Sequence, residues 1–365
     1  MKRVISGILC ILLLCIQMPT AYAVGTSASS AILMEAESGR ILYEQNSHEP
    51  RLIASITKLM TALVALESGC GLQNVITVLK EAVGVEGSSI YLREGEEITL
   101  EALIYGMLLH SGNDAAMAVA IHCGGSAEQF VAAMNQKAEE LGMTNSHFEN
   151  PNGLNGPEHY STAYDMALLA RACLAREELA AILATKSISI GGRSLTNHNK
   201  LLWQYDGCIG LKTGYTEKAG RTLVSAAQRG GMTLIAVTLN DPNDWADHAS
   251  LFDWGFANFA RVQVTQEGTP FGKLPVQGAL CPFVSAVAGE NFAYPICRQD
   301  RMSLALEWEN KQLSAPVDKG TTLGYLNIFC GEQKVAAVPL VTEGTIPSAA
   351  APKKGIFERI GSLIS

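Results

Sequence analysis

The stretch ASITKLMTAL, residues 54–63, places a serine and a lysine at the start of an apolar run. Apolar residues recur in it at the spacing of one helix face, which predicts a helix over residues 54–67 that is buried on a broad side. Ser55 and Lys58 stand three residues apart, so their side chains are neighbours on such a helix. Taken alone, the pair is more typical of a helix cap followed by a solvated lysine. The remainder of the chain has to decide between the two interpretations.

The elements predicted around this helix are strands, then helices, then strands again. A hairpin is expected over residues 31–45, and further helices over residues 99–110 and from residue 114. Strand patterns return in KSISI, RSLTN, CIGLKTGYT, RTLVSAA and MTLIAVTL, and a helix over residues 244–259 follows. This order predicts an α+β fold, in which an antiparallel sheet packs against segregated helices.

Length and composition allow two or three domains and argue against nucleic acid as a partner. The chain has 365 residues, is 48% hydrophobic and 17% charged, and carries a net charge of −8 with no basic stripe. Around residue 260 the pattern changes to short β-like runs between Gly and Pro turns, which predicts a small all-β domain over residues 260–342. Residues 343–354 are expected to form a linker rich in proline and alanine.

Both ends of the chain carry segments typical of export and of membrane contact. Residues 1–23 have two basic residues, an apolar stretch and Ala21-Tyr22-Ala23, which predicts a signal peptide; a permanent N-terminal anchor is the weaker alternative. Residues 355–365 are too short to span a bilayer but carry one apolar stripe, which predicts an amphipathic helix at the membrane surface. The alternative is that this segment docks on the β domain or frays.

The cysteines give no sign of a metal site. Seven of the nine lie beyond the predicted leader, scattered and without a C-x-x-C pair, so no zinc site or disulfide framework is expected. Most are interpreted as small core residues, and one bridge among Cys281, Cys297 and Cys330 is left open. No metal and no cofactor are predicted.

Two further polar triplets interrupt apolar surroundings, and both follow the Ser55–Lys58 pair in the chain. Ser111-Gly112-Asn113 falls between predicted helices, and Lys212-Thr213-Gly214 falls on a predicted strand. S-x-x-K, S-x-N and K-T-G, in that order and in those contexts, are the motifs of penicillin-binding proteins and serine β-lactamases. The chain resembles that superfamily, and more closely the low-molecular-weight D-alanyl-D-alanine carboxypeptidases, the penicillin-binding-protein-5-like members of serine peptidase family S11. The resemblance extends over nearly the whole chain after the leader and includes NPNGL, HYSTAYDMALLA, GLKTGYT and AGRTLVSAA.

This resemblance implies a β-lactamase/transpeptidase-like catalytic domain over residues 24–259, with the β-rich domain after it. It also implies an enzyme that removes the terminal D-alanine from peptidoglycan stem pentapeptides through an acyl-enzyme and that is acylated by β-lactam antibiotics. The expected location is secreted, on the cell-wall side of the cytoplasmic membrane, with peripheral attachment through the C-terminal helix.

The residue types fit that chemistry. A serine hydroxyl needs an adjacent base, so Ser55 is expected to be the nucleophile and Lys58 the general base. Lys58 can act as a base only if burial or a nearby positive charge lowers its pKa, and Lys212 would supply such a charge across the cleft. Lys212 is also expected to bind the terminal carboxylate of the substrate, with help from the Thr213 hydroxyl.

The remaining motif residues receive supporting roles. Ser111 is expected to relay a proton to the departing amine, and Asn113 to orient Lys58 and the substrate amide. The backbone N–H groups of Ser55 and Tyr215 would form an oxyanion hole. Gly214 would leave room for the substrate backbone beside the strand. No role is predicted for Arg221.

Two other functions are considered. A class A β-lactamase deacylates through a glutamate carried on an E-x-x-L-N loop. Here Leu154-Asn155 supplies the L-N, but Pro151 occupies the glutamate position, although Glu149 lies close by, so a carboxypeptidase is favoured. A catalytically weak wall-binding module of the same fold is disfavoured, because a binding module does not need Ser55, Lys58, Ser111, Asn113 and Lys212 together.

Overall fold

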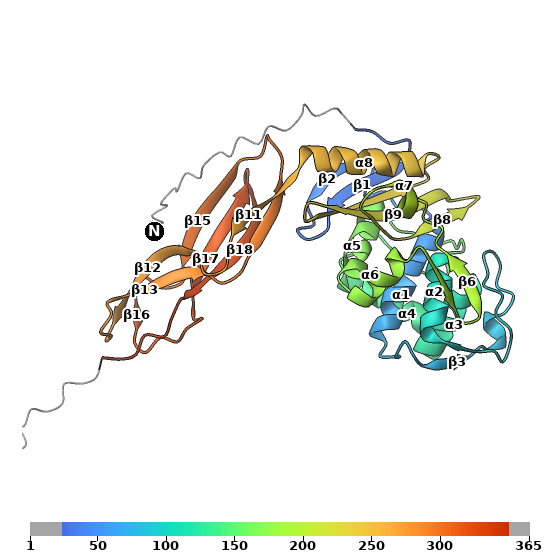
Figure 1. Cartoon of the computed structure of the whole chain (residues 1–365), viewed down its shortest axis with the longest axis horizontal. Coiled ribbons are helices and arrows are strands. Elements are labelled where there is room, and N and C mark those ends of the chain that lie inside the picture. The colour runs from blue at the N-terminus through green and yellow to red at the C-terminus, as the bar shows by residue number, and fades with distance from the viewer. Residues whose placement is uncertain (1–23, 350–365) are drawn as a thin grey trace, which may run out of the picture. The chain divides into compact units, whose positions relative to one another are not determined.

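The computed structural model describes residues 24–349, which separate into two compact units (Figure 1). The first unit extends through Ala260 and the second begins at Arg261. Each unit has its own cluster of buried apolar side chains. The predicted signal peptide and the predicted C-terminal helix over residues 355–365 lie outside the described residues.

The first unit is built on an antiparallel sheet in the order β2-β1-β10-β9-β7, with β8 also paired to β9. β7 and β8 pair with successive parts of β9, so they follow one another along the same edge of the sheet. The predicted hairpin over residues 31–45 is confirmed, and the strand patterns RTLVSAA and MTLIAVTL form two adjacent antiparallel strands. The strands are β1 (Ser30–Glu35), β2 (Ile41–Gln45), β7 (Cys208–Gly210), β8 (Thr213–Thr216), β9 (Gly220–Arg229) and β10 (Met232–Leu239).

Both faces of this sheet are covered, as Figure 1 shows for α8 (Asp244–Asn258) on one side and α5 (Ala163–Leu174) on the other. Ile32 and Met34 of β1 belong to the main apolar cluster. Leu33, which points to the opposite face, lies against Gly255 of α8 together with Leu234. Burial on both faces explains why β1 is a continuous apolar run rather than an alternating one.

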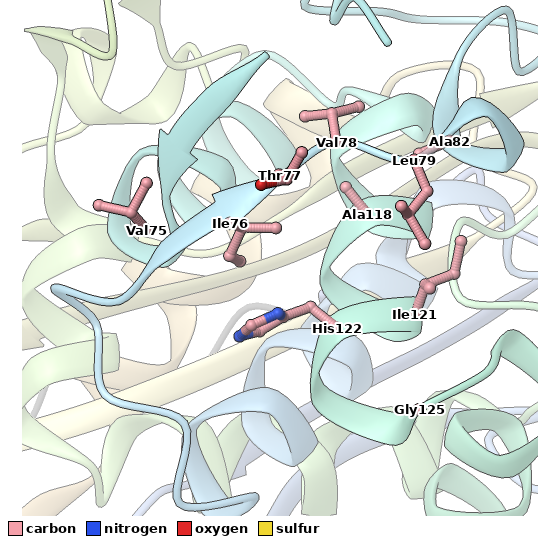
Figure 2. A pocket seen from close by; sticks show the side chains of 10 residues that line it. All are labelled: Val75, Ile76, Thr77, Val78, Leu79, Ala82, Ala118, Ile121, His122 and Gly125. Atoms are coloured by element: carbon pink, nitrogen blue, oxygen red, sulfur yellow. The ribbon is translucent and has the colours of Figure 1, made fainter. Parts of the chain in front are cut away.

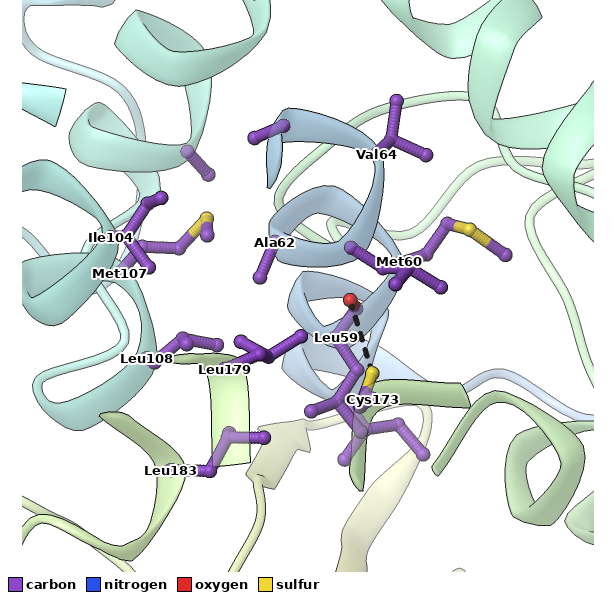
Figure 3. Close-up of a cluster of buried hydrophobic side chains, with 14 of the residues drawn as sticks. Leu59, Met60, Ala62, Val64, Ile104, Met107, Leu108, Cys173, Leu179 and Leu183 are labelled. Carbon is purple, nitrogen blue, oxygen red and sulfur yellow. Dashed lines mark hydrogen bonds between the residues drawn. The ribbon is translucent and has the colours of Figure 1, made fainter. Parts of the chain in front are cut away.

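A group of helices packs against the face opposite α8 and forms most of the core of this unit. In Figure 3, Leu59, Met60 and Ala62 of α1 lie among side chains of α2, α5 and α6. The thiol of Cys173 donates a hydrogen bond to the carbonyl of Leu59 at 3.7 Å. The helices are α1 (Lys58–Glu67), α2 (Leu100–Leu109), α3 (Asn113–Gly124), α4 (Ala127–Glu140), α5 (Ala163–Leu174), α6 (Glu177–Ala184), α7 (Leu201–Gln204) and α8 (Asp244–Asn258).

The start of the first helix differs from the sequence prediction. Residues Ala54–Thr57 form a 3₁₀ turn, η1, and the α-helix begins only at Lys58. Ala54 has a φ of +49°, a left-handed conformation that excludes this residue from an α-helix. In a 3₁₀ turn, residues i and i+3 eclipse one another, so Ser55 lies directly above Lys58.

Several short elements of the first unit have no clear signal in the sequence. The helices α6 and α7 were not predicted, and neither was the ribbon between β3 and β4 near the start of α2. The pair β5 and β6 matches the predicted KSISI and RSLTN strands, but it forms a separate ribbon. These elements are β3 (Val75–Thr77), η2 (Lys80–Ala82), β4 (Glu97–Thr99), β5 (Ser187–Ile190) and β6 (Arg193–Thr196).

The second unit is all-β, as predicted. Its main sheet has the order β15-β17-β18-β13-β12-β16, and β11 pairs with β14. Ile346 pairs with Val317 and packs against the apolar cluster of this unit, so the unit extends past residue 342, where a linker was expected. The strands are β11 (Ala260–Thr265), β12 (Pro270–Gln277), β13 (Phe283–Ala288), β14 (Phe292–Ile296), β15 (Met302–Trp308), β16 (Leu313–Ser314), β17 (Thr322–Cys330) and β18 (Gln333–Thr342).

Candidate active site

The side chains of Ser55 and Lys58 meet, as the sequence predicts. The Nζ atom of Lys58 lies 2.9 Å from the Oγ atom of Ser55. Ser55 is half-buried in η1, whereas Lys58 has no exposed surface. A lysine without solvent contact at the start of a helix excludes the interpretation of a solvated surface residue.

The other contacts of Lys58 define what its nitrogen can do. Nζ lies 2.7 Å from Oδ1 of Asn113 and 2.5 Å from the backbone carbonyl oxygen of Asn152. Both partners are carbonyl oxygens, which accept hydrogen bonds and cannot donate them. A neutral Lys58 amine therefore spends its two N–H groups on these oxygens, and its lone pair faces the Ser55 hydroxyl.

Burial is the main cause that favours the neutral amine. It holds the pKa of Lys58 well below its ordinary value, and the positive charge of Lys212 lowers it further. The carboxylate of Asp114 acts in the opposite direction and raises the pKa. The sequence prediction named burial and Lys212 as the two causes, and both operate.

The loop over residues 148–159 holds η1 and α1 from one side. The hydroxyl of Thr61 donates to the carbonyl of Pro151 at 2.5 Å, and Thr57 bonds the ring of His159 at 2.8 Å. A Cβ atom on Gly153 would come within 2.0 Å of the carbonyl oxygen of Ala54, so only glycine allows this approach. The loop thereby presents the carbonyl of Asn152 to Lys58, a backbone contact that no sequence motif indicated.

The S-x-N triplet lies between α2 and α3, next to Lys58. Asn113 is the first residue of α3, and its Nδ2 donates to the carbonyl of Glu86 at 2.5 Å, which fixes the direction of Oδ1. Ser111 is buried, with a φ of +65°. Among residues 24–349, no hydrogen bond joins the Ser111 hydroxyl to Ser55 or Lys58, so the predicted relay is not assembled as a direct contact.

Asp114 is a site residue that the sequence reasoning missed. Its buried carboxylate accepts hydrogen bonds from the backbone N–H groups of Ile90 and Leu92 and from the hydroxyl of Ser89. These bonds tie residues 89–92 to the first turn of α3. A charged residue inside the apolar pattern DAAMAVA was the available signal, but an acidic residue in a first helical turn is usually explained by the helix dipole alone.

Lys212, the first residue of the K-T-G motif, is also buried. Its Nζ donates to the carbonyl of Thr213 at 2.9 Å, and burial lowers its pKa to about 7. Its backbone exchanges two hydrogen bonds with Val224 of β9, both 2.9 Å long. The K-T-G motif is therefore anchored on the sheet, as predicted.

The register of β8 shows which of its backbone groups are free. Lys212 and Val224 form a hydrogen-bonded pair, and such pairs alternate along an antiparallel ladder. The N–H groups of Thr213 and Tyr215 therefore point away from β9, toward the open edge of β8. The N–H of Tyr215 is available for the predicted oxyanion hole, whereas its side chain is 65% exposed.

Gly214 allows β8 to lie close to η1, the turn that carries Ser55. A Cβ atom at this position would lie 2.4 Å from Oγ1 of Thr222 and 2.9 Å from the backbone nitrogen of Ser55. The sequence interpretation assigned the glycine to space for substrate. The structure adds a nearer reason, since Gly214 is what allows β8 to approach η1.

Left-handed backbone conformations mark all three motifs. Ala54 precedes the nucleophile, Ser111 opens the second triplet and Leu211 precedes Lys212, with φ values of +49°, +65° and +84°. Such conformations are unfavourable for residues other than glycine and persist only where the surrounding structure enforces them. Their position at three separate points of one site indicates that the fold holds this site in a fixed geometry.

Arg221 has a structural environment. It forms an ion pair with Asp244 at 2.6 Å, and its guanidinium lies over the ring of Trp245 at 5.4 Å. These contacts join β9 to α8 and explain an arginine for which the sequence gave no role.

The alternative β-lactamase chemistry lacks its carboxylate here. One oxygen of Glu149 accepts from the backbone N–H of Glu158 at 3.1 Å, within the same loop. In the described part of the chain, no acidic side chain bonds Ser55 or Lys58, and the carbonyl of Asn152 fills the acceptor position beside Lys58. This arrangement supports the preference for a carboxypeptidase.

One pocket of this unit lies apart from the motifs. A pocket of about 450 Å³ lies between residues 75–82 and the face of α3 that carries Ala118, Ile121 and His122 (Figure 2). No motif residue lines it. Over residues 24–349 there is also no group of His, Cys, Asp and Glu side chains arranged for a metal ion.

Comparison with known proteins assigns the family. The model of Peptidase S11, D-alanyl-D-alanine carboxypeptidase, matches residues 17–243, and that of the penicillin-binding protein 5 C-terminal domain matches residues 259–348. D-alanyl-D-alanine carboxypeptidase DacF of Bacillus subtilis is 32% identical over 96% of both chains. The DacD enzyme of Escherichia coli is 33% identical over 86% of both.

Solved structures that cover most of the chain are also similar. Penicillin binding protein 5 from Haemophilus influenzae superposes with a TM-score of 0.77 at 28% identity, covering 90% of this chain and 100% of that one. The PBP3 structure from Streptococcus pneumoniae gives the same TM-score and identity, covering 88% and 100%. With its serine–lysine pair, its K-T-G strand and these relatives, the chain belongs to the Peptidase S11 family of D-alanyl-D-alanine carboxypeptidases.

Proposed function

We propose that this serine carboxypeptidase removes the terminal D-alanine from peptidoglycan stem pentapeptides, with Ser55 as the nucleophile. The observation that carries the assignment is the contact between Ser55 Oγ and a fully buried Lys58 whose other two partners are carbonyl oxygens. That arrangement leaves the lysine lone pair directed at the serine proton. It is a general base positioned for nucleophilic attack.

Acylation begins when Lys58 accepts the Ser55 proton and Oγ attacks the carbonyl carbon of the penultimate D-alanine. The oxyanion that develops is stabilised by the N–H groups of Ser55 and Tyr215. The tetrahedral intermediate expels free D-alanine, whose amine takes up the proton from Lys58, with Ser111 as the relay once substrate fills the cleft. Water then hydrolyses the ester and restores Ser55.

Recognition of the substrate end depends on the K-T-G strand. The terminal carboxylate binds the Lys212 ammonium and the Thr213 hydroxyl, while the substrate backbone lies along the free edge of β8. A bound carboxylate also raises the pKa of Lys212 and keeps it charged. β-Lactam antibiotics carry a carboxylate and a reactive amide, so they acylate Ser55 by the same route.

The test is covalent labelling combined with product release. Ser55→Ala is expected to fold, to gain no mass with benzylpenicillin and to release no D-alanine from a pentapeptide ending in D-Ala-D-Ala. Ser189→Ala, at an exposed position on β5, serves as the matched control and should behave like wild type. A penicilloyl adduct on any residue of the Ser55→Ala protein would overturn the assignment.

The reaction type is tested on the same preparation. Wild type should release D-alanine over many turnovers while it hydrolyses a chromogenic cephalosporin only slowly. Rapid cephalosporin turnover without D-alanine release would identify a β-lactamase instead.

We also propose that the enzyme works on the outer side of the cytoplasmic membrane and attaches to the membrane surface. The support is the leader-like composition of residues 1–23 and the apolar stripe of residues 355–365. Over residues 24–349, no helix is long and apolar enough to cross a bilayer. The chain from residue 24 should sediment together with anionic vesicles, whereas a truncation ending at Pro352 should stay in the supernatant. Equal behaviour of the two forms would refute the attachment.

A further inference from the structure

The peptide group between Ala54 and Ser55 matters twice for the proposed reaction. It leads directly into the nucleophile, and its N–H is one of the two donors proposed for the oxyanion hole. The carbonyl of Ala54 belongs to the same planar group and points in the opposite direction. Any contact that holds this carbonyl therefore also fixes the direction of the Ser55 N–H.

A buried threonine holds the carbonyl. The hydroxyl of Thr57 donates a hydrogen bond to the carbonyl oxygen of Ala54 at 2.8 Å, and Thr57 has no exposed surface. Gly153 lies against the same peptide group, since a Cβ atom there would come within 2.0 Å of the Ala54 oxygen and 3.0 Å of the Ser55 nitrogen. The peptide group is thus bonded at its oxygen and covered by the loop that carries Gly153.

The buried ring of His159 extends this contact by one more hydrogen bond. Its Nε2 lies 2.8 Å from Oγ1 of Thr57, and its Nδ1 accepts from the backbone N–H of Glu149 at 3.1 Å. Because a backbone N–H can only donate, Nδ1 carries no proton, and the proton of the neutral ring is on Nε2. The Thr57 hydroxyl proton is already directed at the Ala54 carbonyl, so Oγ1 accepts from Nε2–H.

The surroundings of His159 favour this neutral tautomer. Burial, with smaller effects of His147 and Lys58, lowers the pKa of His159 to about 4. The side-chain amide of Asn150 places a second donor 3.4 Å from Nδ1. The orientation of that amide is set by its oxygen, which accepts from the backbone N–H of Gly153 at 2.7 Å. A proton on Nδ1 would therefore face two donors.

We propose that His159 is a positioning residue for the oxyanion hole, because it fixes the Ser55 N–H through the Thr57 hydroxyl. The inference rests on the proposed function, in which Ser55 is acylated. Each group in the chain donates to the next, from the imidazole to the hydroxyl and from the hydroxyl to the Ala54 carbonyl. Hydrogen bonds in such a chain strengthen one another, so a bonded carbonyl makes the N–H of the same peptide group a better donor. The chain also helps to enforce the left-handed conformation of Ala54.

The first measurement is acylation by benzylpenicillin, with the chain from residue 24. Thr57→Val replaces the hydroxyl by a methyl group, and His159→Leu removes the ring donor. Each should slow the acylation step by about 10- to 100-fold, somewhat less than the outright loss of an oxyanion donor. The dissociation constant of the complex that precedes acylation should change by less than about threefold, because the donor acts on the transition state.

A second measurement reports on the oxyanion hole itself. Isotope-edited infrared spectroscopy, with a ¹³C label at the β-lactam carbonyl, records the ester carbonyl of the acyl-enzyme. This band should lie at higher frequency in Thr57→Val and His159→Leu than in wild type, because a weaker hydrogen bond leaves a stiffer C=O bond. Thr57→Ser keeps the hydroxyl and should restore the frequency and most of the rate. The double variant should be no slower than the slower single variant, because both substitutions break one chain.

The matched control is a second buried threonine–histidine pair. Oγ1 of Thr238 on β10 lies 3.0 Å from Nε2 of His248 on α8, and neither residue has exposed surface. This pair lies on the sheet face that α8 covers, away from η1. Thr238→Val should lose unfolding free energy as Thr57→Val does, yet keep the wild-type acylation rate and carbonyl frequency.

Three results would overturn the proposal. One is wild-type acylation with an unshifted carbonyl in His159→Leu. Another is equal slowing in Thr57→Val and Thr238→Val, which would identify a general loss of stability. The third is Thr57→Ser acylating no faster than Thr57→Val, a comparison that stays valid if His159→Leu folds poorly. Failure of the proposed function would differ from all three, because wild type would then form no adduct on Ser55.

Discussion

Lys58 and Lys212 are two buried lysines in one site, and their burial shapes both reactivity and stability. Neither has more than 1% of its surface exposed. Desolvation disfavours the charged form of each, so both pKa values fall below the ordinary value. For Lys58 this favours the neutral amine, the form that the proposed general base requires. For Lys212 it means that the charged form, which the proposed binding of the substrate carboxylate requires, destabilises the folded state.

Replacement of Lys212 by methionine should reveal how much the buried charge of Lys212 destabilises the folded state. The folded-state pKa of about 7 lies below the unfolded value of about 10.4, so the unfolded state binds more protons between these limits. The contribution of Lys212 to the unfolding free energy of the wild type is therefore least favourable at pH 7 and below, and it becomes more favourable toward pH 10. Lys212→Met should be more stable than wild type at pH 6. The difference in unfolding free energy between the two proteins should become smaller as the pH rises.

The measurement is urea unfolding from pH 6 to pH 10, alongside penicillin acylation. The difference in unfolding free energy between variant and wild type should change by a few kcal/mol over this pH range, since one pKa unit corresponds to about 1.4 kcal/mol. Acylation should fall by about 30- to 150-fold, which corresponds to about 2–3 kcal/mol for a charged hydrogen bond. Lys218→Met, at an exposed lysine, is the control. A pH-independent difference would contradict the argument.

Gly214→Ala should separate the geometry of the site from the stability of the fold. The added methyl group would collide with Thr222 and with the backbone nitrogen of Ser55, so β8 must move away from η1. We expect acylation by benzylpenicillin to fall by at least about 100-fold, as a misplacement of about 1 Å can do, while circular dichroism stays unchanged. Gly344→Ala, where a Cβ atom meets nothing, should have no effect. Normal acylation by Gly214→Ala would show that the close approach is not needed.

Single residues also show what a sequence can and cannot reveal. Ser55, Lys58, Asn113 and Lys212 were predictable, because each belongs to a motif that specifies a side chain. The carbonyl of Asn152 was not predictable, because any residue carries a carbonyl and only the fold of the loop decides where it points.

At the scale of elements, the first turn of α3 connects two parts of the site. Asp114 holds residues 89–92 through its carboxylate, and it raises the pKa of Lys58. The predicted helices and hairpins were recovered because their apolar periodicity is strong. The 3₁₀ start of the first helix was not, because it results from the left-handed Ala54 and from contacts with Gly153 and Gly214.

Asp114→Asn should therefore shift the pH dependence of acylation. An amide presents one oxygen where the carboxylate offers two, so the loop loses acceptors, and the influence that raises the pKa of Lys58 disappears. The pKa of Lys58 should fall, and the acid limb of the acylation rate should move to lower pH. The unfolding free energy should decrease by about 2–4 kcal/mol.

The matched control is Asp165→Asn, at the first turn of α5. This aspartate also binds a loop, through the backbone N–H of Asn145 and the hydroxyl of Ser146. It should lose comparable stability and leave the acid limb in place. Equal shifts of the acid limb in both variants would show that loosening of a loop, rather than charge at Lys58, controls the profile.

At the scale of the whole molecule, two units with separate apolar clusters should unfold separately. Calorimetry of the described chain is expected to give two transitions, because each unit has its own core. Acylation by benzylpenicillin should raise only the transition of the unit that contains Ser55. A single transition that moves as one on acylation would indicate that the two units unfold cooperatively.

The pairing of β1 with β10 has a consequence for the time course of synthesis. β1 is formed by residues 30–35, yet its partner in the middle of the sheet is residues 232–239. At about 5–20 residues per second, a ribosome needs roughly 10–40 s after β1 to complete that partner. During this interval the only strand that β1 can pair with is β2, and the central sheet cannot close. Until residues 232–239 have been synthesised, the sheet therefore lacks the strand that joins the beginning of the catalytic unit to its end, and this unit cannot reach its final topology.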